Sequence, residues 1–282
     1  GIRTIPTGID HGTVTALLDQ GPVEITTLRH DVSTDGRRAT IAYASNWRED
    51  AARRDFTINA LYADPDSGVI FDYFGGLADL EAGIVRFIGD AAMRIAEDHL
   101  RILRFFRFHA RFGKGEPDAE AIAACAGAAN SLLALSRERI ADELMKLLAL
   151  PDPSDSVDLM LHHGIFAAFM PETAPDAAER LARLLRREHQ ADVEPPSGRR
   201  LNALLPDNAA TVDPVATRLK LSNRARVDLS ARSSHAAPVS AMARALAYRI
   251  GIDLARDIIL LHGSDADWHE ALAQLENWEI PT

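Results

Sequence analysis

Short runs of alternating polar and apolar residues fill the first quarter of the chain, and this pattern predicts β-strands. Two runs rich in β-branched residues flank a turn at 20–22, and alternation places Glu24 on the polar face of the second run. A loop is predicted at Asp35-Gly36. The predicted elements are strands at 11–18, 23–28, 39–43 and 69–74 and a helix at 55–61.

Apolar residues recur every three or four positions from about residue 89 onward, which predicts helices. Prolines at 151, 153, 171, 195 and 196 separate these segments, and no fixed repeat period is present. The predicted helices cover approximately 90–113, 117–130, 136–150, 154–164, 175–190, 213–220, 238–250 and 253–261. The layout therefore predicts an α+β fold: a small module with a mixed β-sheet and helices, followed by an all-helical remainder.

Composition fits a globular chain, since 47% of the 282 residues are hydrophobic and 26% are charged. No run of eighteen apolar residues or secretory leader is visible, so we expect no membrane association. The single cysteine, Cys125, excludes a disulfide within the chain and favours a cytoplasmic location. The net charge of −10 argues mildly against a nucleic-acid partner, but phosphate contact depends on local clusters of cations.

The first such cluster is Arg53-Arg54-Asp55, in a stretch of mixed charge that begins at Glu49-Asp50 and continues to Asn59. A guanidinium there can grip a phosphate or sugar oxygen in a forked geometry, and Asp55 can accept a hydrogen bond from a ribose hydroxyl. The alternative makes Asp55 a helix N-cap and the arginines a solvated edge, and spacing alone favours this alternative.

The second cluster covers residues 97–111, within one predicted helix. Its arginine-bearing half carries Arg101, Arg104, Arg107 and Arg111, with Phe105, Phe108 and Phe112 beside them. A solvated face would mix lysines and glutamates, so we expect this face to pack against something anionic. Asp98 and Arg101, one helical turn apart, present an acceptor and forked donors that can pair with a nucleobase edge. The alternative is a set of helix salt bridges such as Glu97 to Arg101, and the charge pattern does not decide between them.

Two further basic clusters lie in the helical remainder, and each can contact RNA phosphates without reading bases. Solvated helix faces are the favoured alternative for both. His162, His163 and His189 lack partners at metal-ligand spacing and are interpreted as core or surface residues. The clusters consist of Arg180, Arg183, Arg186 and Arg187, and of Arg218, Lys220, Arg224 and Arg226.

Five motifs occur in order within the first 112 residues, and together they resemble one known family. They are Thr7-Gly-Ile-Asp-His-Gly-Thr13, Glu24-Ile-Thr-Thr-Leu-Arg29, Arg53-Arg-Asp-Phe-Thr-Ile-Asn-Ala60, Asp72-Tyr-Phe-Gly-Gly-Leu-Ala-Asp-Leu80 and Glu97-Asp-His-Leu-Arg101. Each is weak alone, but their order and spacing resemble the bacterial CCA-adding tRNA nucleotidyltransferase and poly(A) polymerase family, of the polymerase-β-like nucleotidyltransferase superfamily. Beyond residue 112 only the helical character agrees.

The resemblance implies a domain layout and a role for each matching residue. It implies the C-terminal part of a nucleotidyltransferase head at 1–88, a helical neck with a base-reading helix at 89–150, and an RNA-binding body and tail at 151–282. Residues 72–76 would be a hinge between head and neck, and Glu24 would be a third carboxylate near the catalytic metals. The implied nucleotide-binding residues are Arg53, Arg54 (phosphates), Asp55 (ribose), Asn59, Glu97, Asp98 and Arg101 (base), Arg104 and Arg107; the implied RNA-binding residues are Arg218, Lys220, Arg224 and Arg226.

One family motif is missing: a Gly-Gly-x-Val-Arg-Asp loop followed by an Asp-x-Asp pair. Those aspartates hold the divalent ions of the reaction. Asp64-Pro-Asp66 comes too late, in a predicted turn, and Asp265-Ala-Asp267 is interpreted as surface. Either the segment precedes Gly1, which we favour because Gly1 then falls mid-domain, or the chain alone is not a competent polymerase. No metal ligand is assigned with certainty, and Glu24 is the one candidate.

The predicted function is template-independent addition of CMP and AMP to the 3′ end of tRNA from CTP and ATP, with Mg²⁺ as cofactor. A bacterial poly(A) polymerase is the nearest alternative, disfavoured by the acidic net charge and the lack of a basic C-terminal extension. A non-catalytic RNA-binding relative that kept the nucleotide pocket also stays open. A purely helical scaffold leaves the arginine clusters unexplained. The sequence identifies no protein partner.

Overall fold

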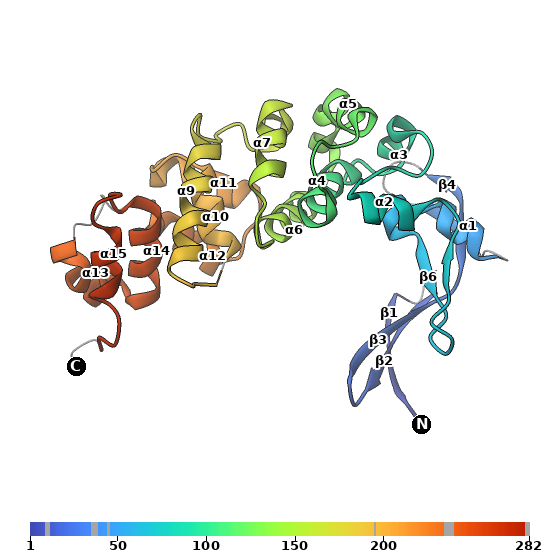
Figure 1. Ribbon diagram of the computed structural model, residues 1–282, viewed down its shortest axis with the longest axis horizontal. Coiled ribbons are helices and arrows are strands. Elements are labelled where there is room, and N and C mark those ends of the chain that lie inside the picture. Colours follow the sequence, from blue (N-terminus) through green and yellow to red (C-terminus); the bar gives the residue numbers. More distant parts are fainter. Residues whose placement is uncertain (9–11, 35–38, 44–45, 195, 234–239, 280–282) are drawn as a thin grey trace. The chain divides into compact units, whose positions relative to one another are not determined.

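The computed structural model describes residues 1–8, 12–34, 39–43, 46–194, 196–233 and 240–279 (Figure 1). The features predicted at 9–11, at Asp35-Gly36, at Pro195 and at 238–239 lie outside these residues. The chain forms two compact units. The first consists of Gly1–Arg101 and Phe112–Ala124, and the second of Ile102–Arg111 and Cys125–Thr282.

The described strands form three small sheets in the first unit. They are β1 (Arg3–Gly8), β2 (Thr13–Leu18), β3 (Gly21–Thr26), β4 (Arg29–Thr34), β5 (Ala39–Tyr43), β6 (Leu61–Ala63) and β7 (Ile70–Asp72). The sheets have the orders β1-β2-β3, β4-β5 and β6-β7, and every pair is antiparallel. The predicted mixed sheet is therefore wrong for the described strands, because paired strands are joined by connections too short for a parallel crossover.

Helices make up most of the remaining chain. They are α1 (Trp47–Ala52), η2 (Thr57–Asn59), α2 (Gly76–Ala82), α3 (Ala91–Glu97), α4 (Arg101–Phe112), α5 (Ala119–Gly127), η3 (Ala129–Ala134), α6 (Arg137–Leu148), α7 (Ser154–His162), α8 (Ile165–Phe169), α9 (Ala177–Gln190), α10 (Ser197–Leu204), α11 (Ala209–Arg218), α12 (Asn223–Arg232), η4 (Ser240–Met242), α13 (Ala243–Ile250), α14 (Ile252–His262) and α15 (Trp268–Ala273). An α+β module followed by helices is thus confirmed.

The predicted single helix at 90–113 is wrong, since α3 ends at Glu97 and α4 begins at Arg101. Asp98 caps α3 with an extended backbone (φ −151°, ψ 107°), and its carboxylate accepts the amide of Leu100 at 3.1 Å. A short polar side chain that bonds a nearby amide competes with the helical ladder, which explains the break.

The predicted helix at 55–61 is reduced to the single turn η2, which packs against α2. The Thr57 hydroxyl donates to the Asp79 carboxylate at 2.7 Å, and Phe56 is fully buried with its ring centroid 4.9 Å from that of Phe87. A Cβ on Gly76 would lie 2.2 Å from the Thr57 carbonyl oxygen. Only glycine therefore fits where α2 begins.

The Asp72–Gly76 segment, which resemblance implies is a hinge, is held by one carboxylate. Asp72 accepts the amides of Phe74, Gly75, Gly76 and Leu77 at 2.8–3.1 Å. Burial alone would raise the pKa of Asp72, but these four amides bring it below its ordinary value. The glycines here serve close packing and a positive φ at Gly75 (79°) as well as any hinge motion.

The core of the second unit combines aliphatic residues with a buried ionic cluster. Glu188 on α9 accepts hydrogen bonds from Arg199 and Arg200 on α10, and all three are buried. Arg200 also donates to the carbonyl oxygens of Leu148, Leu150 and Pro151, which anchors the segment after α6. Helices α10 and α12, which the sequence did not predict, are thus integral to this core.

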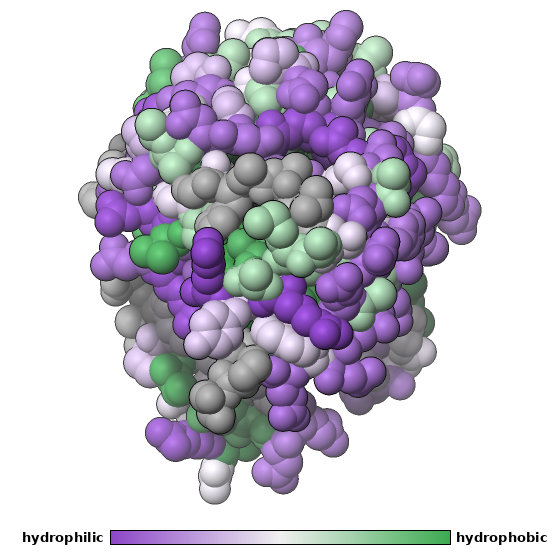
Figure 2. Space-filling model, turned by 90° about the vertical axis from the view of Figure 1, so that its left-hand side faces the viewer, coloured by the Kyte–Doolittle hydropathy of each residue, from purple (hydrophilic) through white to green (hydrophobic). Residues whose placement is uncertain are grey.

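The face of the second unit that carries α13–α15 is mostly hydrophilic, with a smaller number of apolar residues near its centre (Figure 2). Among the described helices, none is both long and apolar enough to cross a membrane.

Candidate functional site

The Arg53-Arg54-Asp55 motif follows directly on α1, whose start is fixed by a reciprocal cap. The Asn46 side chain accepts the Glu49 amide at 2.9 Å and donates to the Glu49 carboxylate at 2.8 Å. The helix ends at Arg53, its C-cap. The motif therefore leaves the helix at a defined residue, and its side chains start from an ordered backbone.

Both arginines of the motif bind one carboxylate, that of Asp50, one turn earlier on α1. Arg53 donates from Nε at 3.0 Å and Nη2 at 2.7 Å to Oδ1, and Arg54 donates from Nη2 at 3.1 Å to Oδ2. The Tyr62 hydroxyl donates to the same Oδ2 at 2.7 Å. Asp50 belongs to the stretch that the sequence singled out, but no role was assigned to it there, although its spacing of three and four residues from the arginines was the available signal.

Charge and burial shift two pKa values in this cluster. Burial lowers the pKa of Arg54, but its bond to Asp50 outweighs this effect, so the pKa is raised overall. Burial and the bond to Asp50 raise the pKa of Tyr62 to about 12. Both groups therefore keep their protons at neutral pH, and the tyrosine acts as a donor to the carboxylate.

Asp55 is buried and is not a helix N-cap, so that alternative is wrong. Its Oδ1 accepts the Phe56 amide at 3.0 Å and the Asn59 side-chain amide at 2.9 Å. The structure thus pairs two of the predicted nucleotide-binding residues, Asp55 and Asn59. A contact with ribose stays a prediction.

The Glu97–Arg101 segment meets the Arg53-Arg54 cluster where an arginine side chain binds a backbone carbonyl. Arg101 donates from Nη2 to the Arg53 carbonyl at 3.2 Å and from Nη1 to the Arg94 carbonyl at 2.8 Å. Arg94, which was not predicted, donates to the carbonyl of Ala52. Two guanidiniums thus cover the C-terminal carbonyls of α1, where cations are favourable.

The predicted salt bridge between Glu97 and Arg101 is present, and Arg94 joins it at 3.0 Å. Burial would raise the pKa of Glu97, but the hydrogen bonds from Arg101 and Arg94 bring it below its ordinary value. Asp98 and Arg101 were expected on one helix, but the helix is interrupted between them: α3 ends at Glu97 and α4 begins at Arg101. Their role in base recognition stays a prediction.

Arg104 and Arg107 lie further along α4, in the second unit. Arg107 donates from Nε to the buried Glu143 carboxylate at 2.6 Å, and both guanidiniums lie over the ring of Phe108, at 5.6 Å and 4.7 Å. Phe105 and Phe108 are buried beside these arginines, and the anionic group that Arg107 meets is the Glu143 carboxylate of the same unit.

Glu24 lies on an exposed stretch of β3, opposite Thr15 in the register of the sheet. Two pairs of threonine hydroxyls are hydrogen-bonded in the same sheet, Thr7 with Thr15 at 2.8 Å and Thr13 with Thr26 at 3.1 Å. In the part of the chain that the structure describes, no group of three or more His, Cys, Asp or Glu residues is placed to hold a metal. A lone carboxylate does not fit a Mg²⁺ site, which needs octahedral oxygen ligands.

The two other aspartate pairs have structural partners. Asp64 accepts the amides of Asp66 and Ser67, which confirms the predicted turn. Asp265 pairs with Arg187, and Asp267 accepts the Ser240 amide, so neither pair replaces the missing motif.

Each predicted RNA-binding cation has a carboxylate nearby. Arg218 donates to Glu172 at 2.9 Å and Lys220 to Glu138 at 2.6 Å, while Arg224 and Arg226 lie within 4 Å of Asp228 and Asp213 at 3.8 Å and 3.6 Å. Arg224 has 92% of its side chain exposed. Such exposed pairs contribute little stability, so they leave the cations available for phosphates, and RNA contact stays a prediction.

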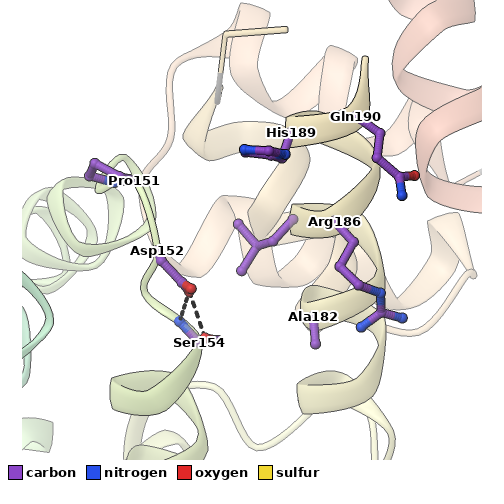
Figure 3. Close-up of a pocket in the computed structure, with 8 residues that line it drawn as sticks. Pro151, Asp152, Ser154, Ala182, Arg186, His189 and Gln190 are labelled. Carbon is purple, nitrogen blue, oxygen red and sulfur yellow. Dashed lines mark hydrogen bonds between the residues drawn. The ribbon is translucent and has the colours of Figure 1, made fainter. Parts of the chain in front are cut away.

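A surface pocket of about 530 Å³ lies in the second unit, between α9 and the segment that leads into α7 (Figure 3). Arg186 and His189 lie on one wall and Asp152 on the other. Asp152 accepts the amide and hydroxyl of Ser154, at 2.9 Å and 2.6 Å. None of the residues predicted to bind nucleotide lines this pocket, so the candidate site remains the motif cluster of the first unit.

Two family models match the chain. The model of the poly(A) polymerase head domain matches residues 2–86, and that of a probable RNA and SrmB-binding site of polymerase A matches residues 116–176.

Curated relatives resemble part of the chain closely. The mitochondrial CCA tRNA nucleotidyltransferase 1 of Mus musculus is 47% identical over 165 residues, which are 57% of this chain and 37% of that protein. The CCA-adding enzyme of Streptococcus sanguinis is 41% identical over 172 residues, or 60% of this chain and 42% of that protein. The matches span 35–51% of the first curated relatives, so the chain corresponds to roughly a third to a half of their length.

Solved structures confirm the fold. The Bacillus stearothermophilus CCA-adding enzyme in complex with CTP superposes with a TM-score of 0.73 at 24% identity, covering 98% of this chain and 69% of that one. The Thermotoga maritima CCA-adding enzyme complexed with tRNA has a TM-score of 0.65 at 21% identity, covering 98% and 67%.

Proposed function

From the two family models and the likeness to CCA-adding enzymes, we propose that the chain belongs to the family of CCA-adding tRNA nucleotidyltransferases and poly(A) polymerases. We propose further that it serves template-independent addition of CMP and AMP to the 3′ end of tRNA. One observation carries the proposal beyond the likeness. Arg101 binds the carbonyl of Arg53, so the two motifs with nucleotide-binding chemistry meet although 48 positions separate them.

The proposed reaction is in-line attack of the RNA 3′-oxygen on the α-phosphorus of CTP or ATP, with pyrophosphate leaving. We propose Mg²⁺ as the cofactor of the whole protein. The described residues do not form a Mg²⁺ site, so the roles proposed for this chain belong to its side chains alone.

Arg54 is the phosphate-binding side chain in this proposal. It is a cation whose outer part reaches solvent, while Arg53 lies more deeply in the cluster, with 18% against 37% of the side chain exposed. Asp55 offers a carboxylate that Asn59 and the Phe56 amide hold still, which suits an acceptor for a ribose hydroxyl.

Base selection is assigned to Arg101 and Asp98. A guanidinium has five N–H groups, and three of those on Arg101 go to Glu97, to the Arg94 carbonyl and to the Arg53 carbonyl. Among the described residues the other two donors have no partner, so they can meet a base edge, with Asp98 as the complementary acceptor. Asp98 and Arg101 belong to the first unit, as do the arginines of the phosphate site.

tRNA is the proposed RNA partner of the helical second unit. Lys220 and Arg224 are exposed, and each would exchange a carboxylate for an RNA phosphate, which is a small loss because surface ion pairs are weak. Arg218 and Arg226 are partly buried beside them and would add to the positive charge.

The test uses protein made from the complete reading frame and a tRNA transcript that lacks CCA. Incorporation is measured with labelled CTP alone, with ATP alone and with both. We expect CMP to be added first and AMP only afterwards. Addition of adenosines alone, in long runs, favours the poly(A) polymerase alternative, and binding of tRNA and nucleotide without incorporation favours a non-catalytic relative.

Discrimination is then measured in the double variant Asp98→Ala, Arg101→Ala. We expect the preference for CTP on the unextended tRNA to be lost. The matched control is Asp142→Ala, Lys146→Ala, which removes an exposed ion pair with 62% and 53% of the side chains exposed. Unchanged CTP preference in the first variant would overturn the assignment of base reading to Asp98 and Arg101.

A further inference from the structure

We propose that Asp50 is a positioning residue that holds both Arg53 and Arg54. It thereby aims at the β- and γ-phosphates of a nucleoside triphosphate the edge of Arg54 that has no partner among the described residues. The inference rests on the proposed function, because it assumes that the cluster binds a nucleotide. It goes beyond that function by assigning a role to Asp50 and Tyr62 and by dividing the work between the two arginines.

Asp50 lies at the centre of a hydrogen-bond network. The residue is 1% exposed, and four hydrogen bonds converge on its carboxylate, two on Oδ1 from Arg53 and two on Oδ2 from Arg54 and Tyr62. A buried carboxylate is costly unless it is paired and hydrogen-bonded, and here both oxygens are engaged.

The charges in this cluster leave a surplus that suits an anion. Two guanidiniums share one carboxylate, so Asp50, Arg53 and Arg54 together carry a net charge of +1. Tyr62 adds a donor but no charge. The carboxylate thus fixes the arginines in place without neutralising both.

The Nε atom of Arg54 is a buried donor that a ligand could satisfy. Its Nε is buried and has no hydrogen-bond partner among the described residues, whereas the Nε of Arg53 donates to Asp50. An unsatisfied buried donor costs about 1–3 kcal/mol, so such a group needs an explanation. A phosphate oxygen is an acceptor that matches the forked edge of a guanidinium.

Tyr62 fixes the carboxylate from the far side. Its ring packs edge-on against Trp47 and Tyr73, with centroids 5.1 Å and 6.3 Å away, so its hydroxyl cannot swing freely. The hydroxyl occupies the same oxygen that holds Arg54. The rotamer of Arg54 therefore depends on Asp50 directly and on Tyr62 through Asp50.

The experiment compares binding of CTP and of CMP to protein made from the complete reading frame, by isothermal titration calorimetry in buffer with Mg²⁺. Asp50→Asn keeps the shape of the side chain and removes its charge. We expect CTP affinity to fall about tenfold, the effect of a lost charge-assisted hydrogen bond, while CMP affinity changes less than about threefold. The matched control Asp66→Asn alters an exposed carboxylate in the same unit and should change neither affinity.

The preference for triphosphate over monophosphate decides the outcome, since a purely structural role would weaken both ligands equally. An equal loss for CTP and CMP, or an unchanged ratio, overturns the inference. If the unaltered protein binds neither CTP nor CMP, the proposed function fails, and this inference fails with it. If the unaltered protein binds CTP normally and Asp50→Asn leaves the ratio of CTP to CMP affinity unchanged, the inference is overturned while the proposed function stands.

A second variant covers the case in which Asp50→Asn does not fold, as judged by its thermal unfolding. Tyr62→Phe removes one of the four donors and keeps every charge. We expect a loss of CTP affinity of about twofold to threefold with CMP affinity unchanged, a smaller effect because a neutral hydrogen bond is lost. The control is Tyr248→Phe, an exposed tyrosine of the second unit. Unchanged CTP affinity in Tyr62→Phe then overturns the inference.

Discussion

Replacing Glu188 by glutamine tests whether the buried ionic cluster holds the second unit together. Glu188 accepts a bond from the Nε of Arg199 and one from the Nε of Arg200, each at 2.8 Å. Asp257 accepts from Arg199 at 2.7 Å and from Arg232 at 2.8 Å. These three guanidiniums and two carboxylates carry a net charge of +1, which the substitution raises to +2 inside the protein.

The cost follows from the burial of the cluster. Removing one partner of a buried ion pair costs about 3–5 kcal/mol, and glutamine still accepts one bond, so we expect about 3 kcal/mol. At about 2–4 °C per kcal/mol the unfolding midpoint of the second unit should fall by about 6–12 °C.

The measurement is thermal unfolding at pH 7, followed by circular dichroism at 222 nm. Because two units can unfold separately, the transition of the helical unit is read on its own. The control is Glu179→Gln, the same change at an exposed position of α9. Midpoints for the two variants within about 2 °C of each other would refute the reasoning, since that is less than 1 kcal/mol.

Three further outcomes are expected. Gly76→Ala should destabilise the first unit by at least about 1–3 kcal/mol, because the new Cβ would meet the Thr57 carbonyl, whereas Gly127→Ala, in open space, should leave the unfolding midpoint unchanged. Asp72→Ala should cost about 1–2 kcal/mol in urea unfolding, because four amides lose their acceptor; a loss under a few tenths would contradict this. Since the pKa of Glu97 is depressed, its stabilising effect is fully present above the ordinary value of 4.5 and is lost as the pH falls through the lower folded value; the midpoint difference from Glu97→Gln should therefore shrink below about pH 4, and a constant difference would argue against the ion pairs.

Periodicity predicted the elements whose pattern is regular. Helices α6, α7, α9 and α14 and strands β2, β3, β5 and β7 fall where alternation or three-to-four spacing placed them. It failed where local polar chemistry overrides the pattern. The break between α3 and α4 comes from Asp98, whose bond to a nearby amide no periodicity encodes, and α10 was hidden because Pro196 reads as a breaker although it caps the helix.

The site was only partly predictable for a related reason. The phosphate-binding role of Arg53 and Arg54 could be predicted, because a guanidinium is a known phosphate-binding group. Asp50 belongs to the same stretch, but the sequence did not indicate its role, because an acidic residue on an amphipathic helix looks like a surface charge until its burial is known. The role of Arg94 was hidden similarly, since besides Glu97 its acceptors are the carbonyls of Ile88 and Ala52, which carry no sequence signal.

The sequence posed ion pairing and nucleotide binding as alternatives for Arg101, yet the contacts of this side chain make them compatible. Its bonds to Glu97 and to two carbonyls take three of five N–H groups and fix a side chain that otherwise loses up to about 2 kcal/mol of rotamer entropy when it binds. That entropy is already lost before a ligand arrives, so the two remaining donors meet a base at lower cost. A lysine would keep the ion pair with Glu97 but would have three donors in place of five, and none would remain for the base. Arg101→Lys should therefore keep the stability of the first unit while losing discrimination between CTP and ATP, and retained discrimination would show that the base is read elsewhere.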